Sequence, residues 1–390
     1  MKLNVLVFFG GESCEHEILC ISANQVLKAL SDSDNNIIPV YVSKNNELYT
    51  GDKLFELKNY YNLDALCNDL TKICLFKDGS TSYFKPINSL FKKAIRVDVA
   101  FLVMHGTGGE DGSLQGYLEL LDIPYTSSNV LGSAIGQDKV IMKEVFEYEK
   151  ISILPWFYCF SKDIENNIKE IEIKADKIGY PLIIKPANLG SSIGIEIAHK
   201  KSELLKKLKA CAIYDNKLVI EKMVTNLKEV NISVMGNIYD FKLSAIEEVM
   251  TNDELLSFKD KYENGGKKLG PKLKGGASKG MASTSRKIPA ELTKKQEERI
   301  KELASKTFKA LNANGVVRID FIIDKDDSKI YVNEINSIPG SLAFYLWKEV
   351  GIDFKQECEN MIDNALKTYR EKKKMTRSFD TNILSNYKGG

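Results

Sequence analysis

The alternation of apolar and polar residues is clearest near the end of the chain. Residues 316–323 and 329–335 are rich in Val, Ile, Phe and Tyr, and the polar run 324–328 supplies a turn between them. This pattern predicts a β-hairpin. Because side chains alternate between the two faces of a strand, Arg318 and Asp320 share one face of the first strand. The other face carries Val317, Ile319, Phe321 and Ile323.

The polar face of this hairpin predicts a binding site. With residue 327 at the centre of the turn, Asp320 lies opposite Glu334. The same register places Arg318 opposite Asn336, and a slip of one residue would separate these pairs onto opposite faces. Facing carboxylates repel, whereas carboxylate and amide oxygens are ligands that Mg²⁺ prefers, usually together with substrate phosphates. We therefore expect a metal and phosphate platform; the alternative is a solvent-exposed polar face with a salt bridge from Arg318.

Continuous apolar runs at the start of the chain predict buried strands of an open parallel sheet. Leu3–Phe9 is such a run, and it leads through a glycine turn into a helix. Further strands are predicted at 37–42 and 97–103, and 44–96 is interpreted as a loosely patterned insertion. The helix is expected to bury Ile18, Ile21, Val26, Leu27 and Leu30. Ligands bind at the strand ends of such sheets, and the absence of a GxGxxG motif disfavours NAD.

Two residues stand at these strand ends. Glu15 lies in the first turn of the helix, where a carboxylate complements the helix dipole. His105 precedes the run 106–112, whose four glycines allow the backbone to approach a ligand closely. Taken alone, each residue has a simple structural explanation.

The middle of the chain predicts a nucleotide slot. After a predicted helix at 133–148, a strand carrying Lys185 runs into a Gly/Ser loop that contains Ser191 and Ser192. Backbone N–H groups and hydroxyls in such a loop can hold phosphate oxygens, although the loop is not a Walker A motif. A tight hairpin with a surface lysine is the alternative. The strand 218–222 ends in polar residues and is expected to form the far wall of the slot.

The remaining segments complete a third unit. Strands are predicted at 230–234 and 239–247, and the Lys- and Gly-rich segment 249–284 is interpreted as an active-site lid. A nucleic-acid-binding loop is the rival, but it lacks the interleaved aromatic residues. A capping box at Thr293–Gln296 opens a helix, and a basic helix is expected at 359–374. The first of these helices is expected to bury Ile300, Leu303, Phe308 and Leu311.

Composition narrows the class of protein. The 390 residues are 43% hydrophobic and have room for two or three domains. A net charge of +2 gives no argument for nucleic-acid or membrane partners. The seven cysteines lack CxxC or zinc spacing, which indicates reduced thiols. We expect no signal peptide and no membrane span, and hence a cytoplasmic protein.

Five motifs together resemble one family. They are the glycine turn with Glu15, His-Gly-x-Gly-Gly-Glu-Asp-Gly, Lys-Pro with its Gly-Ser-Ser loop, Arg-x-Asp-Phe, and Asn-Glu-Ile-Asn-x-x-Pro-Gly. This set resembles the D-alanine–D-alanine ligases of the ATP-grasp superfamily over about residues 3–365. The resemblance implies an α/β (in parts α+β) three-domain ATP-grasp fold. The expected units are a Rossmann-like N-terminal domain 1–127, a central domain 128–222, a C-terminal domain 223–370 with its lid 249–284, and a tail 371–390.

The resemblance also implies roles for individual residues. ATP would be bound by Lys139, Lys185, Ser191, Ser192, Glu221, Lys222, Val224 and Glu229. Two Mg²⁺ ions, with Mn²⁺ as a substitute, would be held by Asp320, Glu334 and Asn336. Glu15 would receive the ammonium of the first D-alanine and form a hydrogen-bonded set with Ser191 and Tyr262, while Arg318 and Gly340 would stabilise the tetrahedral intermediate. Substrates would further contact Ile18, His105, Lys261, Ser341, Tyr345 and Leu346.

The implied activity is the ATP-dependent formation of the D-alanyl dipeptide of peptidoglycan through an acyl phosphate, with release of ADP and phosphate, by a homodimer. In the family a serine commonly anchors the second substrate's carboxylate, and this chain has Tyr345 there. That segment resembles the vancomycin-resistance D-alanine–D-serine ligases, so the acceptor stays open between D-alanine and D-serine. Tyr262 argues against a D-lactate ligase. The alternatives are another ATP-grasp carboxylate–amine ligase and a nucleotide-binding regulatory protein without turnover.

Overall fold

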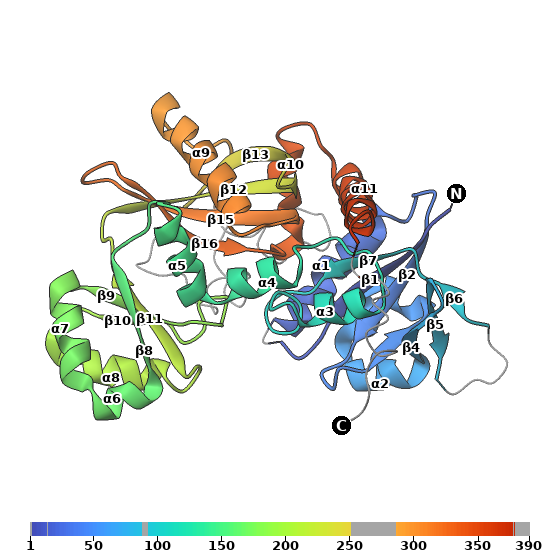
Figure 1. The fold of residues 1–390 in the computed structure, drawn as a ribbon, viewed down its shortest axis with the longest axis horizontal. Coiled ribbons are helices and arrows are strands. Elements are labelled where there is room, and N and C mark those ends of the chain that lie inside the picture. The colour runs from blue at the N-terminus through green and yellow to red at the C-terminus, as the bar shows by residue number, and fades with distance from the viewer. Residues whose placement is uncertain (1, 14, 88–92, 251–285, 377, 379–390) are drawn as a thin grey trace, which may run out of the picture.

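The described part of the chain folds around three sheets. A computed structural model describes residues 2–13, 15–87, 93–250, 286–376 and 378. Their strands form sheets of seven, four and five strands. Figure 1 shows the seven-stranded and four-stranded sheets at opposite ends of the molecule, with the five-stranded sheet bridging them. The fold is mixed α/β, as the sequence predicts.

The first sheet has the order β6-β5-β4-β3-β2-β1-β7. Its strands are β1 (Asn4–Gly10), β2 (Asn36–Val42), β3 (Leu48–Thr50), β4 (Thr71–Asp78), β5 (Thr81–Pro86), β6 (Ile95–Arg96) and β7 (Val99–Val103). β1 pairs in parallel with β2 and β7, and the remaining pairs are antiparallel. The interpretation of 44–96 as a loose insertion is wrong. Its described part contains β3–β6, which extend the sheet because Ile73, Leu75 and Phe84 bury one face against the core.

Helix α1 (His16–Ala29) packs on this sheet directly after the glycine turn. Its buried stripe includes Leu19, Ala23, Val26 and Leu27. The expectation that Ile18 and Ile21 are buried is wrong, since both are half-buried. The helical period instead leaves Ile18 facing a cavity. The other helical segments of this unit are η1 (Asp52–Phe55), η2 (Leu57–Tyr61), α2 (Leu63–Asp69) and α3 (Ser113–Leu120).

The second sheet is antiparallel in the order β10-β9-β11-β8. Its strands are β8 (Trp156–Phe160), β9 (Leu182–Pro186), β10 (Glu196–Ala198) and β11 (Lys217–Lys222). Helices α6 (Ser161–Asn166), α7 (Ile168–Ile178) and α8 (Lys201–Cys211) share a core with it.

The third sheet carries the predicted hairpin and has the order β14-β13-β12-β15-β16. Its strands are β12 (Leu227–Asn237), β13 (Asp240–Val249), β14 (Arg286–Lys287), β15 (Gly315–Asp324) and β16 (Ile330–Asn336). Helix α9 (Lys294–Ala310) begins at the predicted capping box of Thr293 and Gln296. All four predicted apolar residues of this helix region are buried against the apolar face of the sheet. The opposite face of the sheet is therefore available for a site.

Two short helices connect the units. The single helix predicted at 133–148 is wrong, because the structure has α4 (Val130–Gln137) and α5 (Lys139–Tyr148). Between them, Asp138 adopts an extended conformation and its carboxylate accepts hydrogen bonds from the N–H groups of Val140 and Ile141. This cap ends one helix and starts the next. It also places Lys139 at the first position of α5.

The C-terminal elements return to the first sheet. They are η6 (Gly340–Ala343), α10 (Phe344–Lys348) and α11 (Phe354–Lys373). Residues of α11 such as Met361 and Ile362 join the core that contains β1 and β7, and Figure 1 shows α11 beside α1. The tail predicted to start at 371 is helical up to 373. In the part of the chain that the structure describes, no helix combines the length and apolarity needed to cross a membrane.

Candidate active site

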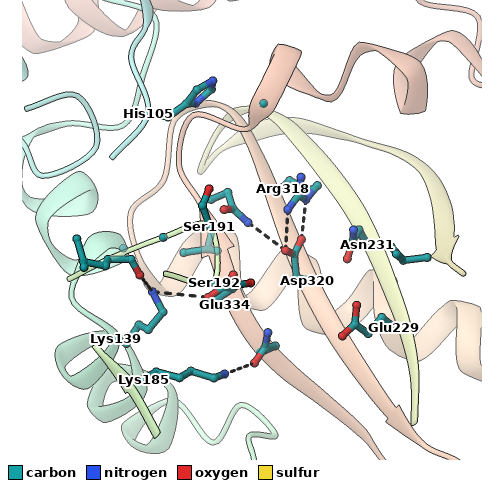
Figure 2. A pocket seen from close by; sticks show the side chains of 18 of the residues that line it. His105, Lys139, Lys185, Ser191, Ser192, Glu229, Asn231, Arg318, Asp320 and Glu334 are labelled. Carbon is teal, nitrogen blue, oxygen red and sulfur yellow. Dashed lines mark hydrogen bonds and ion pairs between the residues drawn. The ribbon is translucent and has the colours of Figure 1, made fainter. Parts of the chain in front are cut away.

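One cavity collects most of the predicted site residues from all three sheets. It is lined from the first unit by Glu15, Ile18 and His105, and from the second unit by Lys139, Lys185, Ser191 and Ser192, with Val224 directly after β11. The third sheet adds Glu229, Arg318, Asp320, Glu334 and Asn336, with Gly340 beyond it. In Figure 2, His105 and Lys185 lie at opposite ends of the view, and Arg318 and Asp320 lie between them.

The predicted register of the hairpin is confirmed. Asp320 pairs with Glu334 and Arg318 pairs with Asn336. The register then shifts between residues 320 and 321, so Asn333 is the extra residue of a β-bulge. This bulge directs Asn333 toward the second sheet, where its side-chain oxygen accepts a hydrogen bond from Lys185 Nζ at 3.2 Å.

Arg318 and Asp320 form a two-pronged ion pair inside the cavity. Arg318 Nε and Nη2 each donate to one oxygen of Asp320 at 2.7 Å, and Asn336 Nδ2 donates to the same carboxylate at 3.1 Å. Burial would lower the pKa of Arg318, but the Asp320 carboxylate outweighs burial and holds that pKa well above its ordinary value. The salt bridge of the alternative interpretation is therefore present, although Arg318 is only 7% exposed and the salt bridge lies inside the cavity, not on an open surface.

The donor set fits a hard cation that also contacts a ligand. Among the described residues, no group of three His, Cys, Asp or Glu side chains is arranged to hold a metal ion. Asp320 and Glu334 nevertheless face each other across two strands in the same cavity, with the Asn336 amide beside them. Two carboxylates and one amide leave coordination positions for phosphate oxygens and water, as Mg²⁺ sites commonly do.

Lysine side chains gather at the opposite wall. Lys139 Nζ donates to the backbone oxygen of Leu189 at 2.8 Å and lies 3.7 Å from Glu334 Oε2. Lys185 forms an ion pair with Glu221, whose other oxygen is 2.7 Å from Lys143 Nζ. Although burial opposes charging, Glu221 keeps the pKa of Lys185 above its ordinary value.

Glu221 and Lys222 differ from the expectation that they line the ATP slot. Both are absent from the cavity lining. Glu221 is 1% exposed and lies between Lys143 and Lys185. Burial would raise its pKa, but these two lysines lower it. Lys222 Nζ donates to the backbone oxygens of Gly179 and Tyr180. The side chain of Glu221 therefore holds Lys185 in place, and the side chains of Glu221 and Lys222 do not themselves line the cavity.

The end of the cavity formed by the first sheet holds Glu15 and His105. Glu15 precedes α1 as its N-cap residue and accepts a hydrogen bond from Ser191 Oγ, which ties the first unit to the Gly/Ser loop. His105 Nδ1 contacts the backbone oxygen of Ile338, and because a carbonyl can only accept, this nitrogen carries the proton. Its Nε2 is buried, and none of the residues that the structure describes forms a hydrogen bond with it. In the neutral form of the ring, Nε2 is then the acceptor beside the cavity.

The segment after Gly340 turns three predicted substrate-binding residues away from the cavity. Ser341, Leu342 and Ala343 have φ values of 50°, 54° and 56°, a left-handed conformation that costs about 1–2 kcal/mol per residue. Burial of Leu342 and Ala343 holds this turn in place. As a result Ser341, Tyr345 and Leu346 do not line the cavity, contrary to expectation.

Sequence reasoning missed a second group of polar residues in the lining. Asn231, Glu247 and Arg286 come from β12, β13 and β14. Asn231 interrupts the apolar run 230–234 at an alternate position, and this signal could have found it. Glu110 was also missed. Its carboxylate accepts hydrogen bonds from the N–H groups of Gly106 and Ile338, each at 2.8 Å, and joins the histidine loop to the segment after the hairpin.

Three predicted features lie wholly or largely outside the described residues. Lys261 and Tyr262 fall in the stretch 251–285, together with nearly all of the predicted lid 249–284.

Comparison with known proteins agrees with this geometry. Residues 4–128 match the family described as the D-ala D-ala ligase N-terminus, and residues 145–363 match the D-ala D-ala ligase C-terminus. The D-alanine–D-alanine ligase of Thermosipho melanesiensis is 38% identical over 384 residues, which cover 98% of each chain. That of Acetivibrio thermocellus is 35% identical and covers 95% of this chain and 97% of the relative.

Solved structures agree as well. The D-alanine–D-alanine ligase of Coxiella burnetii superposes with a TM-score of 0.78 at 25% identity, covering 96% of both chains. The VanG D-Ala:D-Ser ligase of Enterococcus faecalis gives a TM-score of 0.75 at 27% identity, covering 94% of this chain and all of that one. The fold is thus that of the ATP-grasp proteins. Within this class, the chain belongs to the D-alanine–D-alanine ligase family.

Proposed function

We propose that the protein is an ATP-dependent D-alanine–D-alanine ligase that makes the dipeptide used in peptidoglycan. One observation carries the proposal. A single cavity holds two lysines on one wall (Lys139 and Lys185), the facing carboxylates of Asp320 and Glu334, and the Glu15–Ser191 contact. Such a cavity can place a polyphosphate beside the carboxylate of a small zwitterion. Curated relatives with this name at 32–38% identity favour D-alanine over D-serine as the acceptor.

The proposed reaction has two steps. A carboxylate oxygen of the first D-alanine attacks the γ-phosphorus of ATP, and ADP leaves. The amine nitrogen of the second D-alanine then attacks the acyl carbon, inorganic phosphate leaves, and the nitrogen loses a proton. Phosphoryl transfer depends mostly on positioning and charge stabilisation.

The described residues suit these steps. Lys139 and Lys185 reduce the repulsion between the attacking carboxylate and the phosphates. Glu15 attracts the ammonium group of the first substrate. Arg318 and the backbone N–H of Gly340, which both belong to residues lining the cavity, would stabilise the oxyanion of the second step, and Arg318 would then share its charge with Asp320.

Asp320, Glu334 and Asn336 would hold Mg²⁺, with Mn²⁺ as a substitute. When bound, a divalent ion neutralises charge on the phosphate oxygens. Arg318 also pairs with Asp320, so that carboxylate would be shared between the guanidinium and the ion.

Several further features belong to the proposal. The division at residues 127 and 222 falls between the segments that form the three sheets. The cytoplasm is the proposed site of action, because ATP and the precursors of peptidoglycan are made there. A homodimer is proposed from family resemblance.

The test is phosphate release from ATP and Mg²⁺ with D-alanine alone and in competition with D-serine or D-lactate, with identification of the product. The proposal predicts D-alanyl-D-alanine and equimolar phosphate from D-alanine alone. Product that forms only when D-serine is added would contradict it. ATP binding without turnover under any of these conditions would instead indicate a regulatory protein.

A further inference from the structure

Polar residues form a row across the third sheet. The strand registers pair Glu247 with Asn231, Asn231 with Asp320, and Asp320 with Glu334. All four line the cavity. Neighbouring strands are about 4.8 Å apart, so Glu247 lies about 10 Å from Asp320 along the row, on the side away from Glu334. The row therefore continues the cavity beyond the place where the first substrate is activated.

Glu247 is the buried centre of this far end. It is 1% exposed, and its Oε1 accepts hydrogen bonds from Asn231 Nδ2 and the Tyr345 hydroxyl, both at 3.0 Å. Arg286 Nη1 donates to Oε2 at 3.2 Å. Glu247 thus accepts hydrogen bonds from two neutral donors besides Arg286.

Arg286 is held in a fixed plane. Its guanidinium carbon lies 4.3 Å from the centre of the Tyr345 ring, while Glu247 fixes one edge of the group. A guanidinium has five N–H donors in a planar array that matches a carboxylate. Arg286 also lines the cavity, whereas Tyr345 does not. Tyr345 is therefore a support for Arg286 and not a direct ligand of anything in the cavity.

We propose that Arg286 binds the carboxylate of the second amino acid, oriented by Glu247 and Tyr345. The inference rests on the proposed function, because it assigns the acceptor subsite of that reaction. The acceptor amine must reach an acyl carbon near Arg318 and Asp320. Lys139, Lys185 and Glu334 lie on the side of the cavity assigned to the phosphates. The carboxylate of the acceptor therefore extends in the opposite direction along the row, toward Arg286 on β14.

The test compares Arg286→Gln and Arg286→Lys with the wild type and with Lys287→Gln, an adjacent residue whose side chain pairs with Glu291 outside the cavity. Two reactions are measured in the full-length enzyme with ATP, Mg²⁺ and D-alanine. The first is the second-site KM for D-alanine from dipeptide formation. The second is D-alanine-dependent scrambling of ¹⁸O between the bridging and non-bridging positions of ATP. This exchange reports reversible formation of the acyl phosphate from the first D-alanine, a step in which the acceptor takes no part.

The proposal predicts that Arg286→Gln raises the second-site KM roughly 30- to 100-fold, as for loss of a charged hydrogen bond, and keeps the isotope exchange. Arg286→Lys should show a smaller rise of roughly 3- to 10-fold, and Lys287→Gln no change. An unchanged KM in both Arg286 variants overturns the inference and leaves the proposed function intact. Parallel loss of exchange and dipeptide also overturns it, because Arg286 would then be structural. A wild type that releases no phosphate with D-alanine overturns both. If Arg286→Gln does not fold, the second-site KM of Arg286→Lys decides between these outcomes.

Discussion

The two ends of the cavity are built in different ways. At the phosphate end, Lys185 and the Gly/Ser loop come from one continuous stretch of sequence, and Glu221 balances the buried charges of Lys185 and Lys143. At the acceptor end, Arg286, Glu247 and Tyr345 come from three separate elements of the third unit. A site made of one local segment is recognisable as a motif. A site assembled by strand pairing and a left-handed turn becomes visible only in three dimensions.

The largest expected effect lies between the two ends, at Asp320. Asp320→Asn removes one of two facing carboxylates and should lower the turnover number roughly 10³-fold, as for other losses of preorganised charge stabilisation. The measurement is phosphate release at saturating ATP and D-alanine. Asp327→Asn, on the exposed turn of the same hairpin, is the matched control. Equal activity of the two variants would show that this face is not the platform.

The phosphate end is tested by Lys185→Met. The variant should raise the KM for ATP roughly 30- to 100-fold, because a buried charged donor beside the cavity is lost. Glu221 keeps Lys143 as a partner, so the protein should still fold. Lys200→Met, at an exposed position of the same unit, should leave this KM unchanged. A variant whose second-site KM for D-alanine changes more than its KM for ATP would reverse the assignment of the two ends.

A second buried carboxylate, Glu357 on α11, contrasts with Glu221. Glu357 is fully buried, and within the described part of the chain neither of its oxygens has a hydrogen-bond partner. Burial raises its pKa well above the ordinary value. The folded state therefore binds a proton that the unfolded state releases, so Glu357 lowers stability progressively as the pH rises above about 4.5.

Glu357→Gln should remove this pH dependence. The variant is expected to unfold with a free energy about 1–2 kcal/mol larger than the wild type at pH 8, with the difference shrinking toward pH 5. Urea unfolding at both pH values measures this. Glu359→Gln, a half-exposed residue of the same helix, should show no such trend. A destabilised Glu357→Gln at pH 8 would mean that the ionised carboxylate has a stabilising partner.

The smallest effect is expected for Tyr345→Phe. This change removes the hydroxyl bond to Glu247 and keeps the ring beneath Arg286. The second-site KM for D-alanine should rise roughly 3- to 10-fold, less than for Arg286→Gln. A larger effect from Tyr345→Phe than from Arg286→Gln would show that the hydroxyl itself contacts the acceptor.

The sequence was most informative where strands alternate. The period of two fixed the faces of the hairpin, and the pairing of Asp320 with Glu334 followed from the position of its turn. The bulge at Asn333 was not predictable, because no local residue type requires it. The stretch 44–96 was misjudged because a short strand shows too few alternating positions for the pattern to be recognised. The buried face of these strands is defined only when they pair with one another.

Other residues were misplaced by the sequence analysis because their positions depend on tertiary packing. Tyr345 was expected at the substrate, but the left-handed turn at 341–343 is stabilised by burial that only the assembled fold supplies. Glu221 was expected in the slot, and its pairing with Lys143 on α5 depends on how α5 packs. Arg286 was not predicted as a site residue, because it belongs to none of the motifs recognised in the sequence. The role proposed for Arg286 rests on neighbours far away in sequence, such as Tyr345.

The central claim, that one cavity activates the first D-alanine and transfers it to the second, is tested most directly by the fate of oxygen. With D-alanine carrying ¹⁸O in both carboxylate positions, each dipeptide formed should release one inorganic phosphate that contains one ¹⁸O, because the attacking carboxylate oxygen leaves with the phosphate. Mass spectrometry of the phosphate measures this. Phosphate without ¹⁸O, formed together with the dipeptide, would contradict the acyl phosphate route.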